Sequence, residues 1–135
     1  MIKTFSFFVA GVPKSKQYRQ TKSGVIYNTV SAWEKQVAMV AMAEAGPGFK
    51  KMIGAVRMDM WFYFPIPKSR KELSPGDYHL QDPDFTNLLK AAEDGLKKVL
   101  IADDNLVCTL GESGKRWCEA GREGVFISLT VEELK

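Results

Sequence analysis

The chain has 135 residues and a formal net charge of +3, and its 45% hydrophobic and 26% charged residues are typical of one globular domain rather than of a disordered or collagen-like chain. A chain of this length buries about two-thirds of the surface that it exposes when unfolded, so it needs no metal ion to fold, and any bound metal would serve function. Residues 58–66, the most apolar stretch, are too few for a membrane span, and Cys108 and Cys118 are too few for a disulfide framework, so we expect a cytoplasmic protein.

The first half of the sequence predicts, in chain order, a strand over residues 4–12, a polar loop over 13–24, a short strand over 25–27 and a helix over 32–45. The first strand follows from apolar and polar side chains that alternate among β-forming residues. The helix follows from apolar side chains at intervals of three and four residues. Ser31 and Glu34 have the spacing of a capping box at the start of this helix.

Residues 55–64 have the clearest strand pattern in the sequence. Every second side chain from Val56 to Phe64 is apolar, and the positions between them hold Arg57, Asp59, Trp61 and Tyr63. A period of two predicts a long central strand with one face buried in the core.

The second half predicts, in chain order, a loop over residues 65–80, a helix over 85–100, a turn over 103–105, a strand over 106–110, a long hairpin connection over 111–124 and a strand over 125–131. The helix follows from a stripe of apolar side chains at Leu89, Ala92, Leu96 and Val99. The predicted order is two strands, a helix, a strand, a helix and two strands. This order predicts an α+β fold, with two main helices packed on one mixed sheet. We expect residues 1–135 to form a single domain.

Charge is distributed unevenly along the chain. Residues 1–30 contain five basic residues and no acid, whereas residues 77–104 contain seven acids and three lysines. A basic arm attracts polyanions, although a basic run can also be an ordinary solvated loop. Clustered carboxylates repel one another unless a cation compensates them, and Mg²⁺ is the hard cation that carboxylates and substrate phosphates usually hold together.

The acidic residues of segment 77–104 lie before, along and after the predicted second helix. Asp82 and Asp84 lie at the predicted start of the second helix, and a turn that contains Asp103 and Asp104 follows it. On the helix, one face is shared by Asn87, Lys90 and Asp94, and its neighbouring edge is marked by Thr86, Lys90, Glu93 and Lys97. A structural interpretation is also open, because aspartates commonly cap helices and form turns, and Lys90 with Asp94 can be an ordinary surface pair.

The stretch DFTNLLKAAEDGL from Asp84, with ADDNLV from Ala102, resembles the signature of the RusA family of Holliday-junction resolvases, which occurs in bacteria, phages and prophages. The similarity extends to VPKSK from Val12 with its basic loop, to the helix around Trp33, and to FYFP at the end of the central strand. It covers nearly the whole chain. The resemblance implies a RusA-like homodimeric endonuclease that resolves four-way DNA junctions by paired nicks in recombination and repair.

The resemblance also implies roles for individual residues. Asp84 and Asp104 match catalytic metal ligands of the family, and Lys90 matches its catalytic lysine. Thr86 stands where many members have a second acidic ligand, and Asp82 stands where a lysine is usual. Three carboxylates are candidates for the missing ligand of Mg²⁺, for which Mn²⁺ can substitute: Asp82, Glu93 and Asp103.

Further residues are expected to support this site. We expect Asn87 to orient a ligand or water, and Asp94 to lie beside Lys90. His79 stands where family members often have a histidine, and we expect a structural or phosphate-facing role rather than a proton shuttle. The expected DNA contacts are Lys14, Lys16, Arg19 and Lys22. Candidates for the dimer interface are Trp61, Tyr63 and Trp117.

Two other functions remain open at this point. The uncharged Thr86 is compatible with a non-catalytic junction-binding protein whose metal site has degraded, and a broader branched-DNA or flap nuclease would use the same chemistry. The sequence gives little support to a small-molecule enzyme or an organic cofactor. It has no phosphate-binding glycine-rich loop, no serine or cysteine nucleophile motif with a histidine partner, and no zinc-ligand spacing around its two cysteines.

Overall fold

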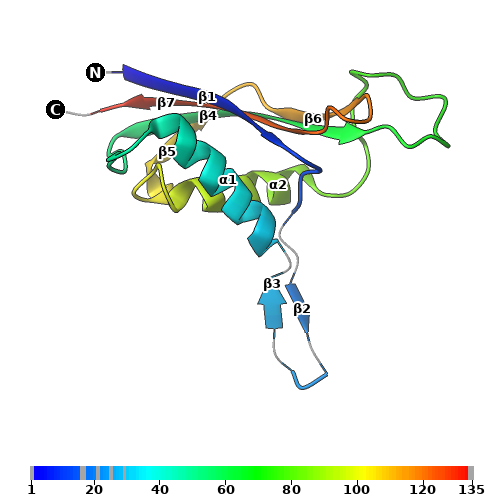
Figure 1. Cartoon of the computed structure of the whole chain (residues 1–135), viewed down its shortest axis with the longest axis horizontal. Coiled ribbons are helices and arrows are strands. Elements are labelled where there is room, and N and C mark those ends of the chain that lie inside the picture. Colours follow the sequence, from blue (N-terminus) through cyan, green and yellow to red (C-terminus); the bar gives the residue numbers. More distant parts are fainter. Residues whose placement is uncertain (1, 16–17, 21, 25, 29, 134–135) are drawn as a thin grey trace.

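The computed structural model describes residues 2–15, 18–20, 22–24, 26–28 and 30–133. Its elements are β1 (Ile2–Ala10), β2 (Tyr18–Gln20), β3 (Ile26–Asn28), α1 (Ser31–Ala45), β4 (Ala55–Pro65), α2 (Phe85–Lys97), the 3-10 helix η1 (Asp104–Leu106), β5 (Val107–Leu110), β6 (Gly114–Cys118) and β7 (Gly124–Glu132). A mixed five-stranded sheet has both α-helices on one side, which confirms the predicted α+β fold (Figure 1). Among the described residues, no helix has the length and apolar character to cross a membrane.

Strand β4 lies at the centre of the sheet. It pairs antiparallel with β7, and β7 pairs antiparallel with β1. The opposite edge of β4 is shared by two parallel strands, because β5 pairs with its first residues and β6 with its last residues. The pair β2–β3 forms a separate hairpin that projects from the helical side of the molecule (Figure 1).

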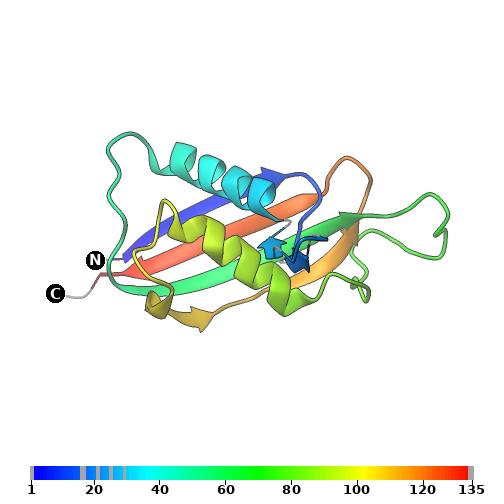
Figure 2. The same cartoon turned by 90° about the horizontal axis from the view of Figure 1, so that it is seen from below.

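The core lies between the sheet and the two helices, which cross one face of the sheet (Figure 2). The alternation predicted for β4 is confirmed, since its even-numbered side chains from Val56 to Phe64 are at most 5% exposed. They pack with the buried side chains of β7 and α2. Complete burial of one such side chain contributes roughly 1.5–3 kcal/mol, so this layer is the main source of stability. The odd-numbered side chains of β4 face the side without helices.

The first helix differs from its prediction only at its start. Helix α1 begins at Ser31, and Val30 occupies the N-cap position without a side-chain cap hydrogen bond. Ser31 is therefore not the N-cap residue that the predicted capping box requires. The buried side chains of α1 include Trp33 and Val37, as the apolar spacing predicts.

The second helix is shorter than predicted and buries a wider face. Helix α2 ends at Lys97 rather than at residue 100, and Leu88, Ala91 and Gly95 join the predicted residues in its buried face. Leu89 and Val99 are only partly buried. The reason is that α2 packs against α1 as well as the sheet, so its buried face turns toward α1.

The predicted hairpin connection over residues 111–124 is wrong. It contains β6, in which Lys115 lies opposite Phe62 and Trp117 opposite Phe64 of β4. The sequence GKRWC is short and polar, and its partner strand is distant in the chain, so local alternation does not reveal it. Strand β2 likewise lies within the loop predicted over 13–24, where it pairs with the short strand predicted near residues 25–27.

Candidate active site

Lys90 lies among three carboxylates on the exposed side of α2. Its Nζ is 3.3 Å from Glu93 Oε1, 3.5 Å from Asp94 Oδ1 and 3.4 Å from Asp104 Oδ2. Glu93 and Asp94 reach Lys90 along the helix at intervals of three and four residues, whereas Asp104 comes from η1. We call these four residues the Lys90 cluster. The Lys90 side chain is 50% exposed, so it is open to a ligand.

The turn after α2 positions Asp104 and Asp103 differently. Asp104 also lies 3.5 Å from Lys97 Nζ, so it links two lysines of α2. Asp103 is the N-cap residue of η1, and its Oδ1 accepts a hydrogen bond of 2.9 Å from the backbone N–H of Asn105. The predicted turn is therefore confirmed, and one of its two aspartates has a structural contact while the other faces α2.

Neighbouring side chains favour the charged forms of both Lys90 and Asp104. Partial burial by itself lowers the pKa of Lys90, but the hydrogen bond to Glu93 and the charge of Asp94 outweigh it, so this pKa is raised above its ordinary value. The pKa of Asp104 is lowered by a hydrogen bond with Asp103 and then by Lys90 and Lys97. Both groups are charged at neutral pH. Lys90 can therefore donate hydrogen bonds and stabilise negative charge, but it cannot accept a proton.

Asp84 stands at the N-cap position of α2 without capping it. Its backbone is extended, its side chain makes no cap hydrogen bond, and its carbonyl accepts a bond of 3.1 Å from Leu88 N–H. The structural interpretation of Asp84 as a capping residue does not hold, and its exposed carboxylate is available to a ligand. Asp82, Thr86 and Asn87 are exposed around the same end of the helix.

The candidate carboxylates are the type of ligand that binds Mg²⁺, but in the described structure they are not arranged as a metal centre. Its oxygens all come from carboxylates, which are the hard ligands that Mg²⁺ prefers. Across the described parts of the chain, no three His, Cys, Asp or Glu side chains have the spacing of a metal centre. The contacts described above bring Glu93 and Asp104 together at Lys90, and they do not join Asp82 or Asp84 to this pair. The carboxylates are therefore of a type that suits Mg²⁺, and their negative charge is greatest around Lys90.

Strand β6 holds the loop that leads to Asp84. The backbone N–H of Gly76 donates to Trp117 O at 2.9 Å, that of Trp117 donates to Asp77 O at 2.8 Å, and that of His79 donates to Lys115 O at 3.1 Å. Beyond His79, the ammonium of Lys115 donates to the carbonyls of Gln81 and Pro83. The sequence pattern does not reveal Lys115, because it does not predict β6.

His79 is a buried structural residue. It is 4% exposed, and its ring lies 4.2 Å from the ring of Phe64 and 4.3 Å from that of Trp117. Burial and the charge of Lys115 lower the pKa of His79, so it is neutral at physiological pH. This position agrees with a structural role and not with a phosphate-facing one. Trp117 is 5% exposed, so its prediction as a dimer-interface residue is wrong.

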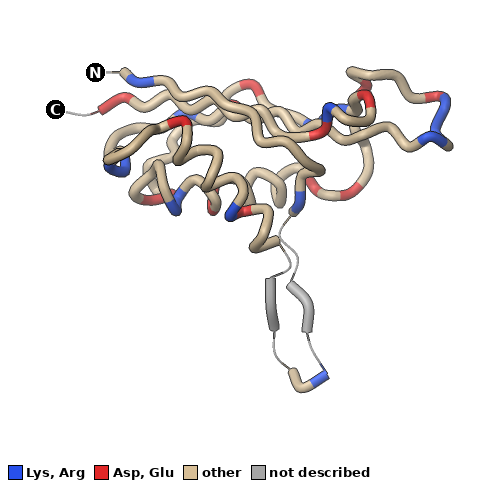
Figure 3. The backbone as a smooth tube through the Cα atoms, viewed as in Figure 1, with Lys and Arg blue, Asp and Glu red and all other residues tan. Residues whose placement is uncertain are grey.

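The predicted DNA-binding arm is described in part. Lys14 and Lys22 are exposed. Lys16 lies outside the described residues, as does the side chain of Arg19. Figure 3 shows basic and acidic residues side by side along the helical side of the molecule. A ligand bound there would meet both signs of charge.

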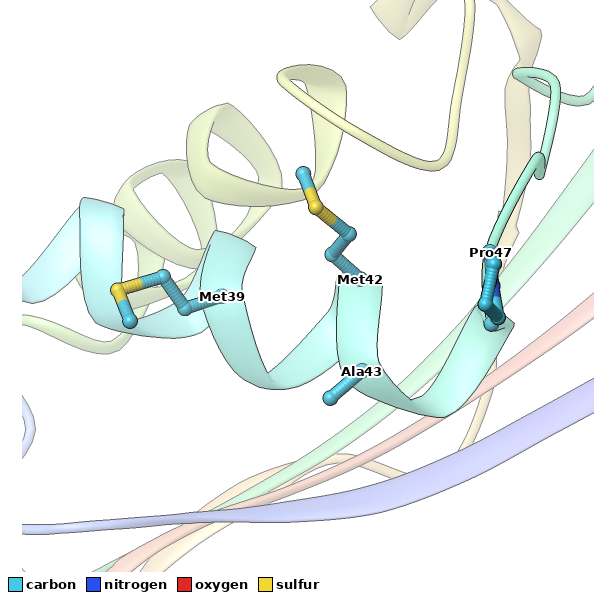
Figure 4. A pocket seen from close by; sticks show the side chains of 5 residues that line it. Met39, Met42, Ala43 and Pro47 are labelled. Atoms are coloured by element: carbon cyan, nitrogen blue, oxygen red, sulfur yellow. The ribbon is translucent and has the colours of Figure 1, made fainter.

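A separate apolar depression lies on the exposed side of α1. It has a volume of about 380 Å³ and is lined by Met39, Met42, Ala43, Gly46 and Pro47 (Figure 4). Because none of these side chains is charged, the depression does not suit a phosphodiester. The Lys90 cluster and the exposed Asp84 remain the better candidates for the site of chemistry.

Comparison with known proteins identifies the family of the chain. No curated protein matches the chain. The family model of the endodeoxyribonuclease RusA matches residues 9–130, which include α2, η1 and the loop that β6 holds. Since this match covers most of the chain, the protein belongs to the RusA family of endodeoxyribonucleases.

Proposed function

We propose that the protein is a Mg²⁺-dependent endodeoxyribonuclease that resolves four-way DNA junctions by paired symmetric nicks, in recombination and repair. Membership of the RusA family supports the endonuclease activity. The observation that carries the assignment of the site is the convergence of Glu93, Asp94 and Asp104 on Lys90 from two separate elements. The exposed Asp84, at the start of the same helix, adds a carboxylate that makes no cap hydrogen bond.

Phosphodiester hydrolysis requires positive charge near oxygens that become more negative in the transition state. The ammonium of Lys90 supplies this charge, because its raised pKa keeps it protonated. The surrounding carboxylates hold the ammonium in place, and its half-exposed position leaves it accessible to a phosphate oxygen. Lys90 thus stabilises charge on the phosphate or on the leaving oxygen.

Asp84 and Asp104 are the proposed ligands of Mg²⁺. Bound Mg²⁺ would polarise the phosphodiester and increase the acidity of a water molecule. Of the three candidates for the remaining carboxylate, Glu93 is favoured because it shares the Lys90 cluster with Asp104. Asp103 is less suitable because its side chain caps η1. Asp82 is exposed two residues before Asp84.

Cleavage of a labelled synthetic junction tests this assignment. We expect Asp84→Asn and Asp104→Asn to abolish nicking with Mg²⁺ or Mn²⁺, because each removes a proposed ligand charge while it keeps the shape of the side chain. Junction binding should remain. Glu119→Gln is the matched control, since Glu119 is a surface carboxylate paired with Arg122. Full nicking activity in either aspartate variant would contradict the assignment.

A second candidate is a protein that binds junctions without cutting them. The uncharged Thr86 and the lack of a preformed metal centre in the described part of the chain favour it. The same assay separates the two functions, because a binding protein leaves the junction intact at every metal concentration. Linear duplex and flap substrates in parallel reactions distinguish a resolvase from a broader branched-DNA nuclease.

We also propose that the protein acts as a homodimer. A four-way junction has near two-fold symmetry, and two matched nicks require two equivalent active sites. Trp61 and Tyr63 remain interface candidates, because both are only partly buried and lie on the side of the sheet without helices. Phe126 of β7 lies opposite Trp61 in the sheet and is 39% exposed, which extends the apolar part of this face.

A further inference from the structure

We propose that Lys115 is a positioning residue of the active site, which holds the loop before α2 so that the carboxylate of Asp84 is presented in one place. This inference rests on the proposed function of Asp84. It concerns a residue whose ammonium contacts the backbone of the loop, and it follows from how β6 holds that loop.

The direction of the Lys115 side chain follows from the alternation along β6. Gly114 lies against the ring of Trp61, and the guanidinium of Arg116 lies 5.1 Å from the centre of the same ring. Both neighbours therefore face the side of the sheet without helices. Lys115, between them, faces the helical side, where α2 begins.

Two carbonyls of the loop accept hydrogen bonds from the Lys115 ammonium. One belongs to Gln81, and the other belongs to Pro83 at a distance of 2.7 Å. The carbonyl of Pro83 is part of the peptide group that continues into Asp84. Hydrogen bonds from a charged donor are stronger than those between neutral groups, so this contact restrains the backbone directly before Asp84.

The loop has few other anchors at this point. Backbone hydrogen bonds to β6 hold residues 76–79, and α2 begins at Phe85. Between these anchors, Leu80 is 87% exposed, and Gln81 and Asp82 are also exposed. In the described structure, the Lys115 ammonium links this stretch to β6 through its hydrogen bonds to the carbonyls of Gln81 and Pro83. The place of Asp84, which does not cap α2, therefore depends on Lys115.

Three variants test the proposal. Lys115→Met keeps the length of the side chain without its donors, and Lys115→Arg restores a charged donor. Arg116→Met is the matched control, because Arg116 lies next on the same strand and holds Gly76 O at 2.7 Å and the hydroxyl of Tyr78. The measurements are single-turnover cleavage of a four-way junction, junction affinity without metal, and Mn²⁺ binding to the protein alone by calorimetry.

We expect Lys115→Met to lower the cleavage rate roughly 10- to 100-fold and to weaken Mn²⁺ binding, as loss of an outer support of a metal ligand generally does. Junction affinity should stay within about twofold, because the exposed cations remain. Lys115→Arg should recover most of the rate, and Arg116→Met should retain it. If Lys115→Met does not fold, Lys115→Gln, which keeps a shorter polar side chain, takes its place with the same expectation.

Two results would overturn the inference alone: cleavage and Mn²⁺ binding by Lys115→Met at the level of the unmodified protein, or an equal loss in Arg116→Met, which would indicate general loosening of the loop. Failure of Lys115→Arg to recover activity would also count against it. An unmodified protein that neither binds Mn²⁺ nor nicks the junction would overturn the proposed function and this inference with it.

Discussion

Lys90 owes its chemical character to its neighbours rather than to burial. Half of its side chain is exposed, yet Glu93, Asp94 and Asp104 all lie within 3.5 Å of its ammonium. Ion pairs at such a surface contribute little to folding stability. Their effect here is to orient a flexible lysine, which would otherwise sample many conformations, toward the side of α2 that carries the acids.

The charge state of Lys90 leads to a prediction about pH. Its pKa is raised above the ordinary 10.5, so the ammonium stays protonated from pH 6 to pH 9, and it would lose its proton only at more alkaline pH. We expect Lys90→Gln to lower the cleavage rate by about 100-fold or more, in the range found when one stabilising donor is removed. The shape of the pH profile over this range should not change.

The measurement is the single-turnover cleavage rate at each pH, with Lys98→Gln as the control on an exposed lysine just after α2. A general base would give a different result, because its removal would abolish a rise in rate with pH. Disappearance of such a rise in Lys90→Gln would contradict the electrostatic role.

The sequence reveals those parts of the site that depend on helical spacing. Glu93 and Asp94 must approach Lys90 because the helix repeats every 3.6 residues. The contact with Asp104 depends on the turn geometry of η1, which the spacing of residues does not give. The family resemblance implied only that both residues belong to the site. The contact of Lys115 with the loop cannot be predicted from the sequence, because the groups that accept its hydrogen bonds are backbone carbonyls. Every residue has a carbonyl, so such a contact leaves no trace in the side-chain sequence.

At the scale of elements, the same contrast explains which strands were predicted. Strand β4 is buried on one face along its whole length, and this burial requires the regular alternation from Val56 to Phe64. Strand β6 lies at the edge of the sheet, where only Trp117 and Cys118 are buried and Gly114 makes room for the ring of Trp61. A strand that is held mainly by backbone pairing with β4 does not need an apolar pattern.

The contact between the two helices depends on Gly95. A Cβ at this position would lie 2.8 Å from Glu34 O and 3.0 Å from Val37 Cβ of α1. We expect Gly95→Ala to lower the free energy of unfolding by about 1–3 kcal/mol, because overpacking outweighs the gain in helix propensity of roughly 1 kcal/mol. Urea denaturation measures the change.

Asn87→Ala serves as the control, since Asn87 is exposed on the same helix and its replacement by alanine brings no clash. It should leave stability unchanged or slightly raise it, because alanine has the higher helix propensity. Equal or greater stability of Gly95→Ala would show that α1 and α2 can move apart without cost.

At the scale of the whole molecule, the two sides of the sheet differ in chemistry. The helical side carries the Lys90 cluster, Asp84 and the projecting hairpin β2–β3 (Figure 1). The opposite side carries aromatic residues of β1, β4 and β7, with Phe8 43% exposed and Phe126 39% exposed. DNA contacts are therefore expected on the helical side, and this arrangement leaves the aromatic side free for the proposed dimer.

This separation predicts where cations matter for DNA binding. Lys14 leads into the hairpin and Lys22 lies in its turn, and both are exposed. Each phosphate contact adds about 0.9 to the slope of log affinity against log salt concentration. We expect the double variant Lys14→Gln and Lys22→Gln to reduce this slope by up to about 2, because each neutralised contact releases no counterions. Fluorescence anisotropy of a labelled junction between 50 and 200 mM salt, roughly the range over which such slopes are read, measures it.

The matched control is the double variant Lys68→Gln and Lys71→Gln, which removes the same charge from the exposed loop between β4 and α2. General attraction by net charge falls equally in both double variants, whereas direct phosphate contacts are lost only where DNA binds. An equal reduction in slope would therefore mean that the basic arm affects DNA binding only through the net charge of the protein. A reduction confined to Lys14 and Lys22 would place the DNA along the hairpin, on the side of the molecule where the Lys90 cluster lies.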